Sequence, residues 1–118
     1  KLLSKNNGLT LVLALSYGSR SEIVDAARSI AEKAKAGELD PTEGDETFFR
    51  MHLYTHHIPD PDLLIRTSGE MRLSNFMLWQ LSYAEMVVSP VLWPDFDKTQ
   101  FHLALEEFAK RHRRFGKV

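Results

Sequence analysis

The segment DLLIRTSGEMRLSNFMLWQLSYAEMVV, residues 62–88, sets the expected fold. Its apolar start predicts a short strand over residues 62–66, introduced by prolines. Ser74 then suits the N-cap position of a helix over residues 74–85. A further short strand, MVVSP, follows at residues 86–90. A strand, a helix and a strand in this order predict a parallel pair within an α/β sheet.

Upstream, the run LTLVLALSY at residues 9–17 is apolar at nearly every position from Leu9 to Leu15. An apolar run without alternation is typical of a strand that is buried on both faces of a parallel sheet. A short buried helix is the alternative. The turn-forming Gly8 and Gly18 bound a run too short for a typical helix, and they favour the strand.

Residues 20–36 are predicted to form the first helix, because their apolar side chains recur at helical spacing. Ser19 and Glu22 fit a capping box at its start. Gly37 fits the position just beyond its C-terminal end, where a left-handed backbone conformation is common. This is the most clearly marked element of the chain.

Two further helices are predicted, a short one over residues 45–54 and a long one from about Asp97, where Gln100 completes a capping box. The apolar stripe of the long helix is Phe101, Ala104, Leu105, Phe108 and His112. The large aromatic residues expected in the core are Trp79, Tyr83, Trp93, Phe96 and Phe101. The whole pattern predicts an α/β fold, a mostly parallel sheet with flanking helices. Three strands make a thin sheet, so we expect residues 1–118 to be the C-terminal part of a single larger domain whose N-terminal half is absent.

Composition restricts the possible functions. The 118 residues carry 15 basic and 16 acidic side chains, so no strong overall field draws the chain toward nucleic acid or an anionic membrane. The sequence has no cysteine, which excludes disulfides and thiolate chemistry. No apolar stretch approaches the roughly 20 residues that span a bilayer. Any anion-binding site must therefore be local.

The loop after the predicted strand at residues 62–66 has the composition of an anion site. Arg66 lies at the carboxyl end of that strand, which is where open α/β sheets bind their ligands. Gly69 allows a close turn, and Arg72 brings a second guanidinium group. Ser74 is the expected N-cap of the predicted helix over residues 74–85, and the free N–H groups at a helix start attract anions. Such donors match the several oxygens of a diphosphate. A carboxylate ligand is the simpler alternative.

An internal ion cluster is the main alternative to a ligand site. In that cluster Arg66 and Arg72 would pair with Glu70 and Asp62. Glu70 and Glu85 could instead help to hold Mg²⁺, which usually takes one or two carboxylates together with substrate phosphates. Either glutamate could also be an ordinary surface residue.

The segments DLLIRTSGEMRLSNFMLWQLSYAEM, LWPDF and RRFG resemble the cis-prenyltransferase family, and most closely its bacterial undecaprenyl diphosphate synthases (isoprenyl transferases). The upstream segment LTLVLALSYGSRSEIVDAAR resembles the strand, turn and helix that precede them in the family. The long pattern R-T-x-G-E-x-R-x-S-N-F, followed by W-Q and Y-x-E, makes the resemblance specific, and it covers nearly the whole chain.

The resemblance implies a transferase of isoprenoid biosynthesis. Its members elongate farnesyl diphosphate with isopentenyl diphosphate by cis condensation, with Mg²⁺ and as homodimers, to give the long undecaprenyl lipid carrier of the cell wall. They are cytoplasmic enzymes that contact the inner face of the membrane. Carried over residue by residue, Arg66, Arg72 and Ser74 bind isopentenyl diphosphate. Glu85 assists in binding the metal and the substrate. It could do so in the site of the partner subunit, across the dimer interface. Arg20, in the Y-G-x-R turn, supports the phosphate region.

Departures from the family pattern limit these implications. The N-terminal half, with the catalytic and metal-binding aspartate and the G-N-x-R-W loop, is not represented in this sequence. Ser16, Ser19 and Ser21 stand where many members have Asn, Gly and Trp. We therefore expect the chain to be inactive alone. A non-catalytic partner subunit of a heteromeric cis-prenyltransferase and a generic anion-binding module remain as alternatives.

Overall fold

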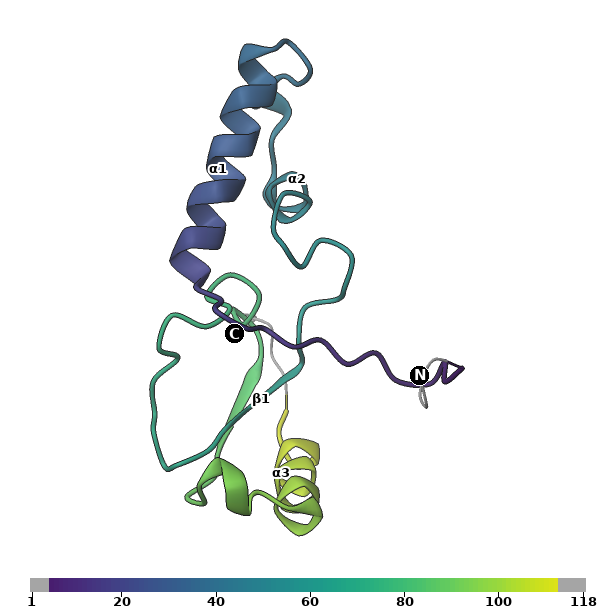
Figure 1. The fold of residues 1–118 in the computed structure, drawn as a ribbon, viewed down its shortest axis with the longest axis vertical. Helices are drawn as coiled ribbons and strands as arrows, with labels where there is room; N and C mark the ends of the chain where they lie inside the picture. The colour runs from purple at the N-terminus through teal and green to yellow at the C-terminus, as the bar shows by residue number, and fades with distance from the viewer. Residues whose placement is uncertain (1–4, 113–118) are drawn as a thin grey trace.

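The computed structural model describes residues 5–112, and their fold is open (Figure 1). The radius of gyration is 17.6 Å, against about 13 Å for a compact domain of 100 residues. Helix α1 (Ser19–Lys35) and the short α2 (Glu46–Arg50) lie at one end, and the strands and the last helix lie at the other. Two single-turn 3₁₀ helices, η1 (Pro41–Glu43) and η2 (Trp93–Asp95), complete the described elements. The RRFG segment lies outside the described residues.

The sheet confirms the predicted parallel pairing. Strands β1 (Leu63–Arg66) and β2 (Glu85–Val88) lie side by side in parallel, with Leu63 opposite Glu85 and Arg66 opposite Val88. Their pairing continues beyond the strands, because the N–H of Glu85 donates to Asp62 O and the N–H of Ser89 donates to Arg66 O. The fold is thus α/β, with two strands in the sheet of the part that the structure describes.

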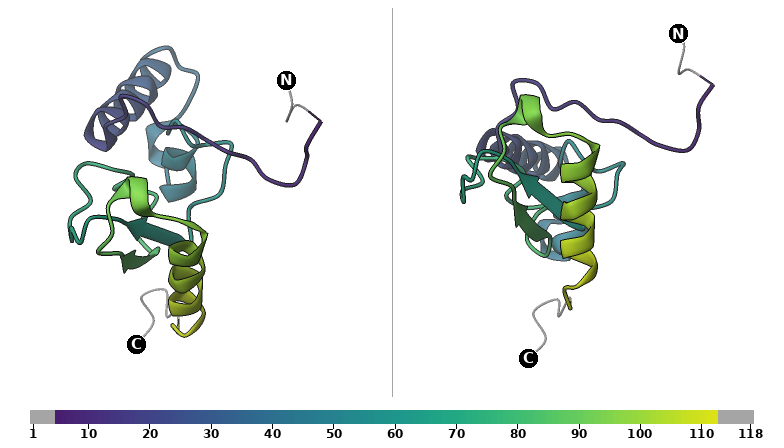
Figure 2. Two further views of the ribbon diagram at one scale, coloured as in Figure 1. Left: turned by 60° about the horizontal axis from the view of Figure 1, so that its bottom comes forward. Right: turned by 90° about the horizontal axis from the view of Figure 1, so that it is seen from below.

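The predicted strand over Leu9–Leu15 is not formed. This segment runs away from the body of the molecule as an irregular extended chain in all three views (Figures 1 and 2). Leu9 is 86% exposed and Leu15 is 82% exposed. A strand needs neighbours for its N–H and C=O groups and cover for both apolar faces, and the described residues provide neither.

Helix α1 matches its prediction, but its start differs. Its N-cap is Gly18, and no side chain from Ser19 or Glu22 caps it, so the predicted capping box is wrong. At the other end the prediction is confirmed: Gly37 has φ +73° and donates to Ala34 O.

Helix α3 (Lys98–Ala109) begins as predicted, with the Asp97 carboxylate accepting a hydrogen bond from Gln100 N at 2.9 Å. It packs on β2, and its Ala104 is buried. The other core residues of the described chain are small in number: Ala26, Leu53, Leu81 and Val87. Several residues predicted for the core are exposed instead, among them Tyr83, Trp93 and Phe101. Leu105, from the predicted apolar stripe of the long helix, is exposed as well. Trp93 stacks on Phe96 and is 73% exposed. No helix among residues 5–112 is long and apolar enough to cross a bilayer.

Candidate anion-binding site

Arg66 ends β1, and the chain turns sharply behind it. Ser68 and Gly69 both have left-handed backbone angles, φ 65° and 67°. Their N–H groups donate to Val91 O at 2.7 Å and to Ser89 O at 2.9 Å, just past the end of β2. The loop is therefore fastened to the carboxyl end of the sheet, where the sequence predicted a ligand site.

The two predicted arginines do come together. Arg66 and Arg72 line one cavity of about 240 Å³, with Leu64, Ile65, Leu73 and Phe76 as its apolar walls. Glu70 lies between them: it pairs closely with Arg72, and its carboxylate is 4.0 Å from Arg66. The part of the predicted ion cluster that involves Glu70 is therefore formed. The cavity is present beside it. Arg66 Nε is buried and has no hydrogen-bond partner among the described residues.

Ser74 lies in a turn and not at a helix start. Residues 74–85 were predicted as a helix, but residues 74–83 form a succession of turns and bends, and Glu85 begins β2. Leu73 O accepts from Phe76 N at 3.2 Å, and the two central residues Ser74 and Asn75 have φ 51° and 64°. Positive φ at both central positions is the geometry of a type I′ turn, which ends any helix. The helix dipole invoked at Ser74 is therefore absent, and Ser74 offers its exposed hydroxyl alone.

The first residues of helix α1 contact this turn. The N–H of Ser19 donates to Asn75 O and the N–H of Arg20 donates to Asn75 Oδ1, both at 2.9 Å. In return, Ser19 Oγ accepts from Leu78 N at 2.9 Å. Arg20, predicted from a weak motif, is thus placed next to the loop that carries Arg72 and Ser74. The sequence signal for this turn is Asn75 itself, because asparagine tolerates positive φ better than most residues.

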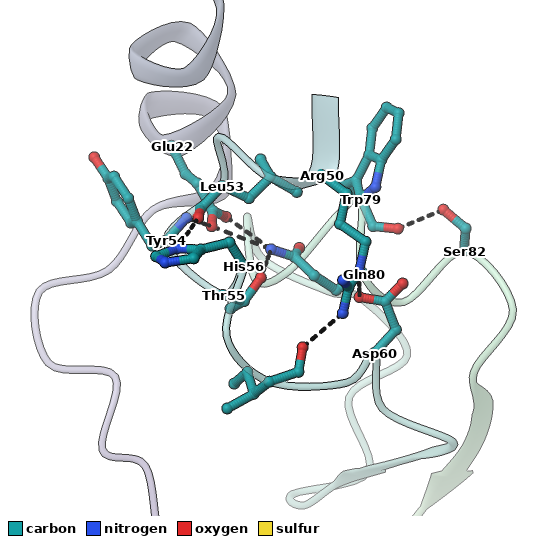
Figure 3. A network of polar contacts seen from close by, with 11 residues as sticks. Glu22, Arg50, Leu53, Tyr54, Thr55, His56, Asp60, Trp79, Gln80 and Ser82 are labelled. Atoms are coloured by element: carbon teal, nitrogen blue, oxygen red, sulfur yellow. Dashed lines mark hydrogen bonds and ion pairs between the residues drawn. The ribbon is translucent and has the colours of Figure 1, made fainter. Parts of the chain in front are cut away.

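A buried carboxylate holds the same region together (Figure 3). Glu22 is fully buried and accepts from Tyr54 N at 2.9 Å and from Gln80 Nε2 at 3.1 Å. Tyr17 also donates to it, and burial together with that bond raises the pKa of Tyr17 above its ordinary value. Gln80 donates to Thr55 Oγ1 as well. Glu22 was predicted to cap α1, and its real partners lie 32 and 58 positions away.

A second, larger cavity of about 510 Å³ adjoins this network. Arg50 lines it, donates to Ile58 O at 2.7 Å, and lies 3.6 Å from Asp60 (Figure 3). Its mixed lining of Glu46, Asp62, Trp79 and Tyr83 presents acids as well as one arginine. It is less suited to an anion than the cavity between Arg66 and Arg72.

Glu85 lies at the other end of the strand pair. It begins β2, three residues before the partner of Arg66, which separates the two by about 10 Å along the sheet. Its carboxylate pairs with Arg111 at 3.0 Å. No group of three potential metal ligands occurs within residues 5–112. Within one copy of the chain, Glu85 is not part of the arginine site.

Sequence comparison decides the family. The profile described as undecaprenyl diphosphate synthase matches residues 1–116. The chain belongs to this prenyltransferase family. The isoprenyl transferases of Oceanobacillus iheyensis and Bacillus subtilis are each 55% identical to it, over 96% and 98% of the chain. The undecaprenyl diphosphate synthase of Micrococcus luteus, specific for (2E,6E)-farnesyl diphosphate, is 52% identical. The chain spans about half the length of these relatives, 44–45%.

Solved structures of prenyltransferases have the same fold over this region. The lavandulyl diphosphate synthase of Lavandula x intermedia, in complex with dimethylallyl diphosphate, matches with a TM-score of 0.91 at 46% identity. That match covers 96% of this chain and 49% of the other. A probable undecaprenyl diphosphate synthase of Campylobacter jejuni matches with a TM-score of 0.72 at 41% identity, over 89% of this chain. The α/β fold class is thus shared with known family members.

Proposed function

We propose that this chain carries the isopentenyl diphosphate site of a cis-prenyltransferase that elongates farnesyl diphosphate to a long-chain polyprenyl, undecaprenyl, diphosphate. One observation carries the proposal: Arg66 and Arg72, which are adjacent in neither sequence nor strand, line one cavity at the carboxyl end of the sheet. The relatives named for undecaprenyl diphosphate synthesis support the choice of substrate.

The cavity suits both halves of that substrate. Guanidinium groups bind phosphate oxygens in a planar, bidentate way. The exposed hydroxyl of Ser74, which follows the lining residue Leu73, is proposed as a further donor. Leu64, Ile65 and Phe76 offer apolar contact to a five-carbon prenyl group. Arg66 Nε, buried without a partner, gains a hydrogen bond when a phosphate oxygen arrives. In the structure Glu70 pairs with Arg72 and neutralises its charge. When the diphosphate binds, it replaces Glu70 as the partner of Arg72.

In the reaction, the allylic diphosphate leaves carbon 1 of the growing chain and the double bond of isopentenyl diphosphate attacks that carbon. The resulting cation then passes a proton to an oxygen of the released diphosphate, and a new cis double bond forms. The residues of this chain hold the nucleophile: Arg66, Arg72 and Ser74 fix its diphosphate and so aim its double bond. Arg20 adds positive charge from α1. The allylic site and the family's catalytic aspartate belong to the part of the family outside this sequence, so we expect no turnover by the chain alone.

Mg²⁺ is proposed as the cofactor, and Glu85 as the carboxylate of this chain that would hold it. When bound, the ion neutralises charge on a diphosphate. One carboxylate with substrate phosphates is an ordinary set of protein ligands for this ion, and the Glu85 side chain remains 26% exposed beside Arg111. Its distance from Arg66 along the strand supports action in the site of a second copy. We therefore propose a homodimer. Its proposed cytoplasmic location and peripheral membrane contact rest on the family resemblance alone.

The test is calorimetric titration of the chain with isopentenyl diphosphate. We expect Arg72→Ala to weaken binding by about tenfold or more, as loss of a charged hydrogen bond costs about 1.5–3 kcal/mol. Arg28→Ala, an exposed arginine of α1 paired with Asp25, is the matched control and should bind as the unaltered chain does. Equal affinity for sulfate and isopentenyl diphosphate would instead identify a generic anion module.

A further inference from the structure

Asn75 joins the two turns that carry the predicted phosphate ligands. It directly follows Ser74 and comes three residues after Arg72. Its carbonyl and side-chain oxygens accept the N–H groups of Ser19 and Arg20, which lie 55 and more positions earlier in the chain. One residue thus contacts both segments at once.

The start of α1 depends on these bonds. Its first N–H groups have no partner inside the helix, and its N-cap, Gly18, has no side chain to offer. Asn75 replaces the missing cap from a distant part of the sequence. Gly18 also permits the approach, because a Cβ there would lie 3.0 Å from Asn75 Nδ2.

The turn depends on α1 in the same way. Ser74, Asn75 and Met77 all have positive φ, between 47° and 64°, a region that residues other than glycine rarely adopt. The bond from Leu78 N to Ser19 Oγ and the two bonds to Asn75 hold this strained segment against the helix. The three bonds form a clasp between α1 and residues 73–78.

We propose that Asn75 is a positioning residue for the diphosphate site: through this clasp it holds the start of α1, and with it Arg20, against the turn that carries Ser74. The inference rests on the proposed function for its ligand, isopentenyl diphosphate. It assigns Asn75 no contact with the substrate. Its effect on binding passes through Arg20.

The first variant is Asn75→Gly, which keeps the backbone carbonyl and tolerates φ 64° but removes Oδ1. We expect its affinity for isopentenyl diphosphate to fall about fivefold, in line with one hydrogen bond of about 1 kcal/mol. Asn7→Gly, the same substitution in the exposed N-terminal segment, is the matched control and should leave the affinity unchanged.

A double-mutant cycle separates positioning from general loosening. Arg20→Gln should weaken binding in the unaltered chain and have little further effect in Asn75→Gly, because Arg20 is then already misplaced. An undiminished effect of Arg20→Gln in the Asn75→Gly background overturns the proposal. Gly18→Ala, which crowds Asn75 without changing it, should repeat the weaker binding on a smaller scale, even if Asn75→Gly fails to fold.

Hydrogen exchange at the Arg20 amide supplies a readout without ligand. Its protection should be lost in Asn75→Gly and kept in Asn75→Asp, which retains an oxygen at the same place. Equal exchange in both variants overturns the clasp. If the unaltered chain fails to bind isopentenyl diphosphate, the proposed function is wrong, and so is the choice of this ligand for the role of Asn75. If it binds, and Asn75→Gly binds equally well, only the positioning role falls.

Discussion

Two regions of this chain reverse the usual relation between apolar content and burial. Residues 9–15 are the most apolar run, yet their side chains are largely exposed, with Leu11 at 77% and Leu13 at 71%. Residues 67–84 are mixed in composition and contain no helix or strand, yet Gln80 and Leu81 are buried there. Hydrogen bonds with α1 hold the loop, whereas residues 9–15 make no such bonds to the rest of the described chain.

The difference shows that burial depends on partners more than on apolar content. A strand that is buried on both faces needs two neighbours and two covering layers, all from elsewhere. A loop can be fixed by a few directed bonds, here from Ser19, Arg20 and Glu22. The described residues do not supply the neighbours and covering layers that a strand over residues 9–15 would need. Helix α1 alone supplies the hydrogen bonds that the loop needs.

The largest expected effect tests the apolar run. Leu11→Ser and Leu13→Ser should change the unfolding free energy of this chain by less than about 0.5 kcal/mol, as for surface positions. In a fusion that supplies the remaining part of the Bacillus subtilis relative, each should cost about 3 kcal/mol, because both side chains then enter a core. Urea unfolding of both proteins measures the contrast. A similar small effect in the fusion would show that the run stays exposed there as well.

The next effect tests the loop's anchor. Glu22→Ala removes the acceptor for the part-buried Tyr54 N and the buried Gln80 Nε2, and leaving these donors unpaired should cost about 2 kcal/mol. Glu32→Ala on the exposed face of the same helix should stay within about 0.5 kcal/mol. Urea unfolding with far-UV circular dichroism compares the two. If both variants unfolded alike, the anchor would contribute nothing.

A glycine pair compares the two regions directly. Gly69→Ala places a side chain at φ 67°, and it should destabilise the chain by about 1 kcal/mol. Gly8→Ala meets nothing within 4 Å in the N-terminal segment, and it should have no measurable effect. Thermal unfolding of the two variants gives the comparison, and a loss of stability in Gly8→Ala would reveal contacts that the structure lacks.

The smallest effect is a pH dependence. Burial and the hydrogen bond to Glu22 raise the pKa of Tyr17 above its ordinary 10.0. The unfolded chain therefore loses this proton first, and stability that is complete below pH 10 should decline as the pH rises beyond it. Tyr17→Phe should remove this part of the decline, as followed by urea unfolding between pH 8 and 11. Identical slopes for both proteins would contradict the assignment.

Local signals predicted the elements that depend on local structure. Helix α1 and the start of α3 followed from periodicity and from Asp97, and the strands around Arg66 and Val87 followed from short apolar runs bounded by turns. Positive φ at Ser74 and Asn75 ended the predicted helix at residues 74–85, because the turn is fixed by α1. The structure brings Arg66 and Arg72 to one cavity. The roles of these two arginines, and of Ser74, Arg20 and Glu85, in binding stay predictions.

The sequence by itself determined the family, the parallel strand pair and the two arginines of the candidate site, since each is carried by neighbouring residues in a fixed pattern. Only the tertiary structure decided what caps α1, where Glu22 is bonded and whether residues 9–15 are covered. Those outcomes depend on groups far apart in the chain, or on surfaces that must be supplied from elsewhere, and no local pattern records the distance between them.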